Sequence, residues 1–157
     1  MKILFYSELF IPFVGGNEAY LANVESRIKA LGHKTLHITS QIDDTSKEET
    51  IKWDGKDVPV KRMKIPFKND YLSKGRYFFP FNARKVSKIA KDFDIIHATT
   101  FLAGLGGWKI GKLAKKPCLL YCNELFGDVW KDIGENWIQK NIYPIVEKYI
   151  VSKYNFF

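Results

Sequence analysis

KILFYSELFIPFVGGNEAYLANVESRIKALGH (residues 2–33) decides the fold, because it has the pattern of one complete strand, turn and helix. Lys2 to Tyr6 form a short apolar run before a loop with a proline and two adjacent glycines, as a buried parallel strand does. Asn17 is placed to cap the following helix, and Gly32 to end it. The apolar positions at helical spacing are Leu21, Val24, Ile28 and Leu31. This unit predicts the start of an alternating α/β fold.

The rest of the chain continues the alternation. Apolar, β-prone runs predict strands at residues 33–40, 58–63, 94–98 and 117–122. Helices are expected at 82–93, 101–115 and 135–153, the last with a kink at Pro144. The polar residues 43–57 indicate a surface excursion or a hairpin. Together these elements predict a Rossmann-like parallel sheet with helices on both faces, whose ligands bind beyond the carboxyl ends of the strands.

Within the helix expected at 101–115, glycines are unusually frequent. They are Gly104, Gly106, Gly107 and Gly111. Glycine lowers helix propensity, but it lets a helix approach its neighbours closely. We therefore expect close packing along this helix.

Length and composition limit the class of protein. The 157 residues are 46% hydrophobic and 27% charged, which fits one globular domain and excludes disordered, collagen-like and coiled-coil chains. The net charge of +8 favours an anionic partner, such as nucleic acid, a membrane surface or an anionic ligand. Cys118 and Cys122 are too far apart in a strand for a disulfide and too few for a zinc site, so we interpret them as buried thiols in a reducing compartment.

Targeting and metal signals are missing from this sequence. Ser7 and Glu8 interrupt the apolar N-terminal run, and no small-residue cleavage site follows, so a signal peptide is not expected. No run has the roughly 20 apolar residues of a membrane span. Because no carboxylate cluster of the Asp-x-Asp kind occurs, no metal is expected. We expect no cofactor either. We expect the protein in the cytoplasm.

The positive charge is concentrated between Lys61 and Lys91, where ten basic residues accompany one acid, Asp70. The basic residues are Lys61, Arg62, Lys64, Lys68, Lys74, Arg76, Arg84, Lys85, Lys88 and Lys91. The aromatic residues among them are Phe67, Tyr71, Tyr77, Phe78, Phe79 and Phe81. Basic and aromatic residues together favour docking on an anionic bilayer, which would be the inner face of the cell membrane. A solvated basic face is the alternative, and no recognised nucleic-acid motif accompanies the charge.

The loops at the expected carboxyl ends of the strands contain residues suited to ligand binding. Gly15 and Gly16 would leave backbone N–H groups open to an anion at the start of a helix, although a flexible turn explains them equally well. His97 can donate to a ligand oxygen, although a lone histidine is more often structural. We interpret His33 and His37 as structural. Since no serine or cysteine is placed with a histidine and an acid in a recognisable motif, covalent hydrolase chemistry has little support.

Three motifs carry a family resemblance. Residues 12–18 with the helix ending Leu31-Gly32-His33, residues 94–98, and Pro117 with residues 123–130 occur in order and at family-like spacing. Together they resemble the first half of retaining GT-B glycosyltransferases of family four, over nearly the whole chain. The resemblance implies that residues 1–157 form one Rossmann-like, acceptor-side domain. The second domain of this family, which binds the nucleotide sugar, is absent from this chain.

The resemblance also implies roles for individual residues. The donor would be a nucleotide-diphosphate sugar and the acceptor a polysaccharide or lipid-linked glycan. Its diphosphate would lie on Gly15, Gly16 and Asn17; the catalytic residues would be His97, Asn123 and Glu124; and Thr99, Thr100 and Phe126 would lie on the acceptor or sugar side. Asn123 stands where relatives usually have a histidine, so it can hydrogen-bond but not accept a proton.

The resemblance has one testable consequence, and one alternative function remains. We expect the chain alone to be inactive, because half of the family's cleft is missing from it. The alternative function is a non-catalytic basic module that docks on an anionic membrane or polymer.

Overall fold

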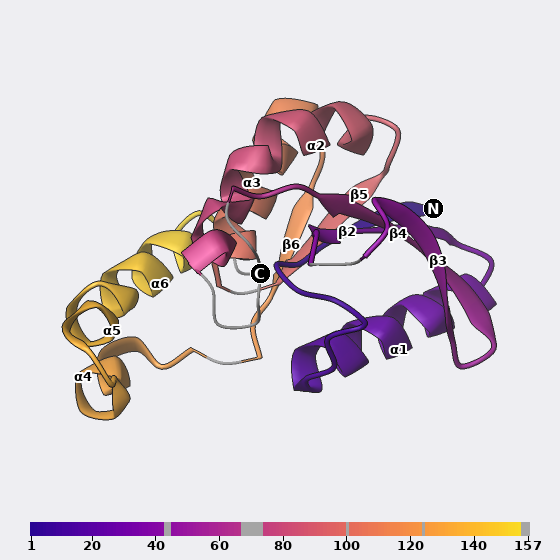
Figure 1. Cartoon of the computed structure of the whole chain (residues 1–157). Helices are drawn as coiled ribbons and strands as arrows, with labels where there is room; N and C mark the ends of the chain where they lie inside the picture. The colour runs from indigo at the N-terminus through magenta and orange to yellow at the C-terminus, as the bar shows by residue number, and fades with distance from the viewer. Residues whose placement is uncertain (43–44, 67–73, 100, 124, 155–157) are drawn as a thin grey trace.

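The computed structural model describes all residues except 43–44, 67–73, 100, 124 and 155–157. Its centre is a six-stranded sheet in the order β3-β4-β2-β1-β5-β6 (Figure 1). The strands are β1 (Lys2–Tyr6), β2 (Lys34–Ser40), β3 (Glu48–Trp53), β4 (Lys56–Met63), β5 (Ile95–Thr99) and β6 (Cys118–Tyr121). All neighbouring strands are parallel except β3 and β4, which are antiparallel. The predicted α/β class is therefore confirmed, with an antiparallel hairpin at one edge.

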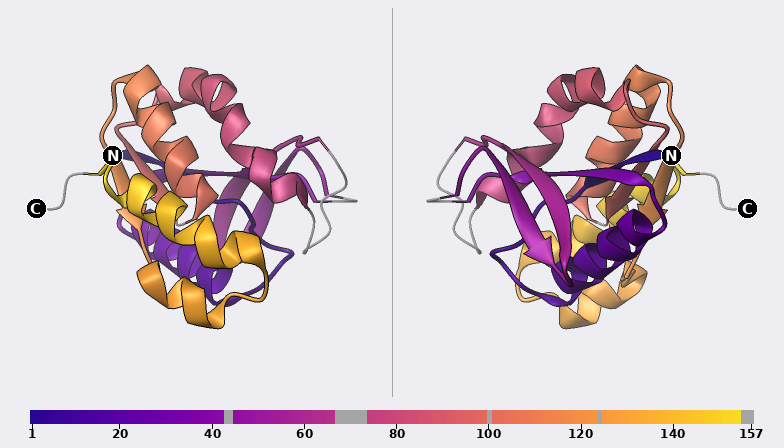
Figure 2. Two further views of the ribbon diagram at one scale, coloured as in Figure 1. Left: turned by 90° about the vertical axis from the view of Figure 1, so that its left-hand side faces the viewer. Right: turned by 90° about the vertical axis from the view of Figure 1, so that its right-hand side faces the viewer.

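Helices cover both faces of the sheet (Figure 2). They are α1 (Gly16–Ala30), the 3-10 helix η1 (Lys74–Asn82), α2 (Ala83–Ala90), α3 (Leu102–Ala114), the 3-10 helix η2 (Gly127–Val129), α4 (Trp130–Ile133), α5 (Trp137–Asn141) and α6 (Tyr143–Val151). On one face, Leu4 and Tyr6 of β1 pack with residues of α2 and α3; on the other, Ile3 and Phe5 pack with Leu21 of α1. Since strand residues alternate between faces, β1 contributes to both cores.

The glycines of α3 let this helix lie close to the sheet, as the sequence predicted. A Cβ on Gly107 would lie 2.3 Å from the Cβ of Ala98 in β5. A Cβ on Gly106 would lie 2.6 Å from the ring of Tyr6. Both distances are far below van der Waals contact, so a side chain at either position would push α3 away from the strands.

The start of α1 differs from the prediction, whereas its end agrees. Gly15, not Asn17, is the N-cap, and the Glu18 carboxylate accepts a hydrogen bond of 2.9 Å from the Gly15 N–H. This bond satisfies the helix end without an Asn17 cap. At the other end Gly32 has φ of +83°, and the His33 N–H donates to the carbonyl of Ile28, which ends the helix as predicted.

The polar segment before β4 forms a hairpin, which was one of its two predicted forms. Its turn is Asp54-Gly55, with φ values of 47° and 70°. This dipeptide favours the two-residue hairpin turn, whose backbone twist matches that of paired strands. Residues 43–44 lie outside the described residues.

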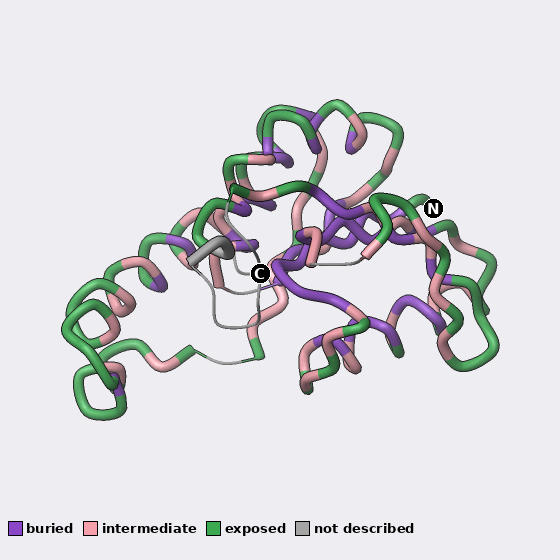
Figure 3. The backbone as a smooth tube through the Cα atoms, viewed as in Figure 1, coloured by how far each residue is buried: buried purple, intermediate pink, exposed green. Residues whose placement is uncertain are grey.

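The end of the chain was predicted as one amphipathic stretch over 135–153 with a kink at Pro144, and the break lies at Ile142, two residues before that proline. The segment forms two helices, α5 and α6, and Pro144 lies in the first turn of α6, where its missing N–H costs nothing. The short elements η1, η2 and α4 were not predicted. We call residues 127–151 the helical arm; most of its residues are exposed or half-buried (Figure 3). None of the helices in the described part of the chain is long and apolar enough to cross a membrane.

Candidate active site

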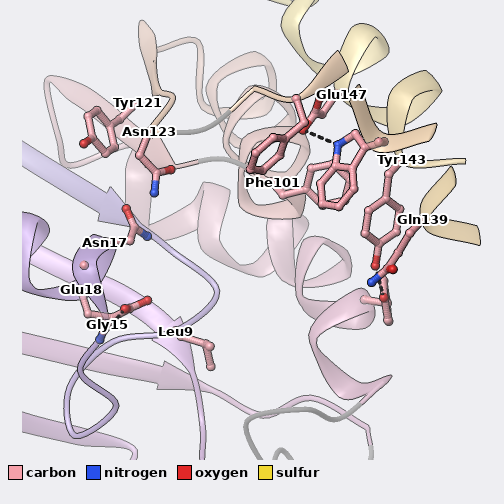
Figure 4. Close-up of a pocket in the computed structure, with 14 residues that line it drawn as sticks. Leu9, Gly15, Asn17, Glu18, Phe101, Tyr121, Asn123, Gln139, Tyr143 and Glu147 are labelled. Carbon is pink, nitrogen blue, oxygen red and sulfur yellow. Dashed lines mark hydrogen bonds between the residues drawn. The ribbon is translucent and has the colours of Figure 1, made fainter. Parts of the chain in front are cut away.

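A cavity of about 730 Å³ lies beyond the carboxyl ends of β1 and β6, between the sheet and the helical arm (Figure 4). We call one side the sheet-edge wall, made of Leu9, Gly15, Gly16, Asn17, Glu18, Tyr121 and Asn123. We call the other side the arm wall. Its residues are Trp130, Gln139, Tyr143 and Glu147 of the helical arm, together with Tyr77, Phe101 and Phe126. The volume is that of a typical small-molecule site. Of the candidate residues, the cavity therefore brings together Gly15, Gly16, Asn17, Asn123 and Phe126.

The two glycines of the turn differ in their surroundings. The Gly15 N–H is bonded to Glu18, so it is not open to an anion as expected. A Cβ on Gly16 would meet no other atom within 4 Å. Gly16 is therefore the glycine whose missing side chain leaves room for a ligand at the start of α1.

Asn17 and Asn123 lie near each other on the sheet-edge wall, with Tyr121 beside them (Figure 4). Asn17 Oδ1 is buried and has no hydrogen-bond partner among the described residues. Tyr121 is held in place by the ring of Tyr20, which stacks on it with centroids 4.0 Å apart. These amides are suited to hydrogen-bonding the hydroxyl groups of a ligand.

His97 and Thr99 do not line the cavity, contrary to expectation. The His97 ring lies beside Phe5, with centroids 4.9 Å apart, and 6.1 Å from the ring of Tyr121. Burial lowers the pKa of His97 to about 4, so the imidazole is neutral near pH 7. Thr99 is buried as well. Glu124 and Thr100 are outside the described residues.

A buried chain of polar side chains, which sequence reasoning missed, lies behind the sheet-edge wall. Ser7 Oγ donates to the carbonyl of Leu9 (2.6 Å), so it accepts from His37 Nε2–H (2.7 Å). His37 Nδ1 is hydrogen-bonded to Glu25. The order matches that of a hydrolase triad, yet Ser7, His37 and Glu25 are fully buried, and the hydroxyl proton is already committed to Leu9. The network is structural, and Glu25 on the apolar face of α1 was the signal that could have revealed it.

Sequence reasoning also missed the residues of the arm wall, apart from Phe126. Glu147 is buried and accepts hydrogen bonds from the Gly127 N–H (2.8 Å) and from Trp130 Nε1 (2.9 Å). These bonds fix the indole of Trp130, which lines the cavity. An acidic residue on the inward face of an otherwise apolar helix was the available signal.

The expected basic surface is smaller than predicted. Lys61 pairs with Glu48 at 2.5 Å, and buried Arg62 donates to Glu49 and to the carbonyl of Ile11, so both are engaged within the fold. The exposed residues of the set are Lys64, Arg84, Lys85, Lys88 and Lys91. Lys68 lies outside the described residues, as do the side chains of Lys74 and Arg76.

The two cysteines are free thiols, both partly buried. Burial raises the pKa of Cys118 to about 12, and burial also raises the pKa of Cys122. Both therefore remain protonated near neutral pH. Among the described residues, no three His, Cys, Asp or Glu side chains are arranged to hold a metal ion.

Comparison with known proteins identifies the family. Residues 14–154 match the family model described as Glycosyltransferase Family 4. The chain belongs to glycosyltransferase family 4. The resemblance found in the three sequence motifs is thereby confirmed. A search of curated protein sequences gave no match.

Solved structures that are similar to this chain include a synthase and two glycosyltransferases. Sucrose-phosphate synthase from Thermosynechococcus elongatus matches 95% of this chain with a TM-score of 0.68 at 16% identity. The lipopolysaccharide outer core galactosyltransferase WaaB in its apo form matches 78% (TM-score 0.47, 21% identity) and covers 32% of that protein. A glycosyltransferase from Rickettsia africae matches 84% (TM-score 0.43, 16% identity) and covers 34%. The family-4 chain spans only 39% of the length of the sucrose-phosphate synthase, and its fold is that of one GT-B half-domain.

Proposed function

We propose that this chain is the acceptor-side half of a retaining glycosyltransferase, which moves a sugar from a nucleotide-diphosphate sugar to an acceptor. The observation that supports this most is the cavity where Gly16, Asn17 and Asn123 meet. It lies at the carboxyl ends of the strands, where α/β proteins bind their ligands. Membership of family 4 adds the reaction class.

In this proposal the start of α1 stabilises the negative charge that grows on the diphosphate when the sugar leaves. Gly16 allows a close approach, and the amides of Asn17 and Asn123 hydrogen-bond sugar hydroxyls. The bond between the sugar C1 and the phosphate oxygen breaks, and the acceptor oxygen bonds to C1 on the same face. The acceptor proton goes to the leaving phosphate, since an asparagine amide cannot accept it.

The test is a pair of variants in the full-length protein, Gly16→Val and Ala30→Val, which place the same side chain at opposite ends of α1. Release of nucleoside diphosphate is measured with UDP-glucose, GDP-mannose and ADP-glucose, together with thermal melting. We expect Gly16→Val to lower turnover about tenfold or more with little change in melting temperature, because the blocked approach weakens charge stabilisation. Ala30→Val should retain the wild-type rate. An unchanged rate in Gly16→Val would show that the turn is not part of the site. If the wild-type protein releases no nucleoside diphosphate from any of the three donors, the proposed function is contradicted.

The chain alone should bind these donors weakly. With only one half of a two-domain cleft, we expect a dissociation constant no better than about 1 mM and no transfer. Isothermal titration calorimetry with the same three donors measures it. Micromolar binding would contradict the division of the site between two halves.

We further propose that the protein docks on anionic membrane through η1 and α2. Phe81 is 77% exposed and precedes α2, on which Arg84, Lys85 and Lys88 are also exposed. An exposed aromatic ring beside basic residues suits the interface of an anionic bilayer. The buried ring of Phe79 and the engaged Arg62 are not part of this surface.

Vesicle sedimentation tests the docking. Replacing Arg84, Lys85 and Lys88 by Gln should weaken binding to phosphatidylserine-containing vesicles about 100-fold, since each nearby cation contributes about 1 kcal/mol. The control replaces Arg27, Lys29 and Lys34, near the end of α1 on the opposite face, and should bind like the wild type. Binding should also fade with added salt. Equal binding to neutral and anionic vesicles, or none at low salt, excludes this role.

A further inference from the structure

Strand β3 forms one edge of the sheet (Figure 1), and in the described part of the chain it pairs with β4 alone. The hydrogen-bonded positions of this pair follow from one bond, in which the Arg62 N–H donates to the carbonyl of Lys47 at 2.7 Å. In an antiparallel pair such positions recur at every second residue. The N–H and C=O groups of Glu48, Thr50 and Lys52 therefore point away from β4, toward the outer edge of the sheet.

The same three residues are exposed, on the face of the hairpin opposite α1. The alternate residues Ile51 and Trp53 pack on the α1 side. A charge on an edge strand normally discourages pairing with another chain. Here the two charges are symmetric, since Glu48 lies two residues before Thr50 and Lys52 two residues after it. An antiparallel copy of β3 centred on Thr50 would therefore place each charge opposite its counter-charge.

We propose that β3 is a dimerisation edge, which pairs antiparallel with β3 of a second copy of this chain about a two-fold axis at Thr50. In this register Glu48 lies opposite Lys52 of the second copy, and Thr50 lies opposite Thr50. These residues exchange backbone N–H···O bonds, because their N–H and C=O groups are the ones that point outward. A register shifted by two residues would place Thr50 opposite a charged residue, so the charges select the register centred on Thr50.

The pairing builds rows of alternating charge across four strands. Within each copy, Lys52 lies opposite Asp57 and Glu48 lies opposite Lys61, with which it forms an ion pair. Across the dimer, each row becomes Asp57 and Lys52 of one copy followed by Glu48 and Lys61 of the other. Opposite charges on directly facing residues stabilise strand pairing, whereas like charges destabilise it.

The dimer should be weak, because two paired six-residue strands bury less surface than a stable interface does. We expect a dissociation constant of about 0.1 mM, so the chain is a monomer at low micromolar concentration. The cavity lies near β6, at the other edge of the sheet from β3. Dimerisation therefore leaves the cavity of each copy open.

Sedimentation equilibrium of the 157-residue chain between about 10 µM and 1 mM tests the proposal, once circular dichroism and melting show that each sample is folded. Glu48→Lys and Lys52→Glu each put two like-charge pairs into the homodimer, so each alone should dimerise at least about tenfold more weakly than the wild type. An equimolar mixture of the two variants forms a heterodimer in which both opposite-charge pairs are restored. Its dissociation constant should return to within about threefold of the wild-type value.

The matched control is Lys56→Glu, which changes the net charge by the same amount as Lys52→Glu. Lys56 is exposed in the same hairpin but lies on β4, away from the outer edge. This variant should dimerise like the wild type. The measurements are made at about 0.15 M salt, where charges far from the interface are screened.

NMR of the wild-type chain locates the interface without depending on any variant. Between about 30 µM and 1 mM, the amide signals of Glu48, Thr50 and Lys52 should shift most, because their N–H groups gain acceptors. Three results would each overturn the proposal: a wild-type chain that is still monomeric at 1 mM, a mixture that associates no more tightly than either variant alone, or concentration-dependent shifts that lie outside β3.

Discussion

The two walls of the cavity differ in what holds them in place. Behind the sheet-edge wall, Ser7, His37 and Glu25 form a fully buried network that ties the loop after β1 to both β2 and α1. The arm wall is held by Glu147 and by ring contacts, and most of the surrounding arm is exposed (Figure 3). One wall therefore depends on the global fold, and the other on a few local contacts.

This difference predicts two levels of stability in one site. Segments with few buried contacts open at lower free energy than the core around them. We expect the sheet-edge wall to open only when the whole domain unfolds, whereas the helical arm opens separately. In such a site one wall stays rigid while the other can open to admit and release a ligand.

The largest expected effect is that of Glu25→Ala. The substitution leaves His37 buried without its partner, and breaking one member of a buried pair typically costs about 3–5 kcal/mol of unfolding free energy. Urea denaturation followed by circular dichroism measures the loss. The control, Glu48→Gln, breaks an exposed pair with Lys61 and should leave the unfolding midpoint unchanged. If Glu25→Ala lowers the free energy of unfolding by less than about 1 kcal/mol, the buried network is not what supports the sheet-edge wall.

The contrast between the walls also explains what the sequence could reveal. Strand and helix periodicity placed Gly16 and Asn123 at the carboxyl ends of strands, because that information is local. The network was hidden, since Glu25 and Ser7 lie 12 and 30 residues from His37. Two helices of the arm, α4 and α5, have four and five residues and are too short for a periodic signal. The positions of η2 and α4 depend on hydrogen bonds to Glu147, which lies 20 and 17 residues away from its partners. The sequence therefore predicted Gly15, Gly16, Asn17 and Asn123 of the sheet-edge wall, but only Phe126 of the arm wall.

The same reasoning applies to the individual site residues. The end of β5 was located within one residue, but which side chains reach the cavity depends on packing with other strands, such as that of His97 against Phe5 of β1. His97 consequently lies behind the wall rather than in it.

A second, smaller effect concerns pH and the buried ring of His97. Its pKa falls from 6.5 to about 4 on folding, so between these values the unfolded chain binds more protons than the folded one. The free energy of unfolding is therefore unaffected by His97 above pH 6.5. It decreases by up to about 3 kcal/mol as the pH falls toward 4, because the unfolded chain binds the proton more tightly. Urea midpoints measured from pH 8 to pH 4 should fall less steeply in His97→Gln than in the wild type. Parallel curves would show that His97 is not held neutral behind the sheet-edge wall.

The smallest effect is expected in the arm wall, from Asn136→Ala. The Asn136 side chain accepts a hydrogen bond from the Gln139 N–H at 3.0 Å, and it therefore caps α5, the helix that carries Gln139 to the cavity. Losing this cap costs about 1 kcal/mol. If the arm opens separately, that cost speeds hydrogen exchange about fivefold in residues 137–151 and leaves exchange in the strands unchanged. Asn136→Asp retains a capping oxygen and should exchange like the wild type. Equal acceleration in the arm and in the sheet would mean that both walls belong to one cooperative unit, and the distinction between them would fail.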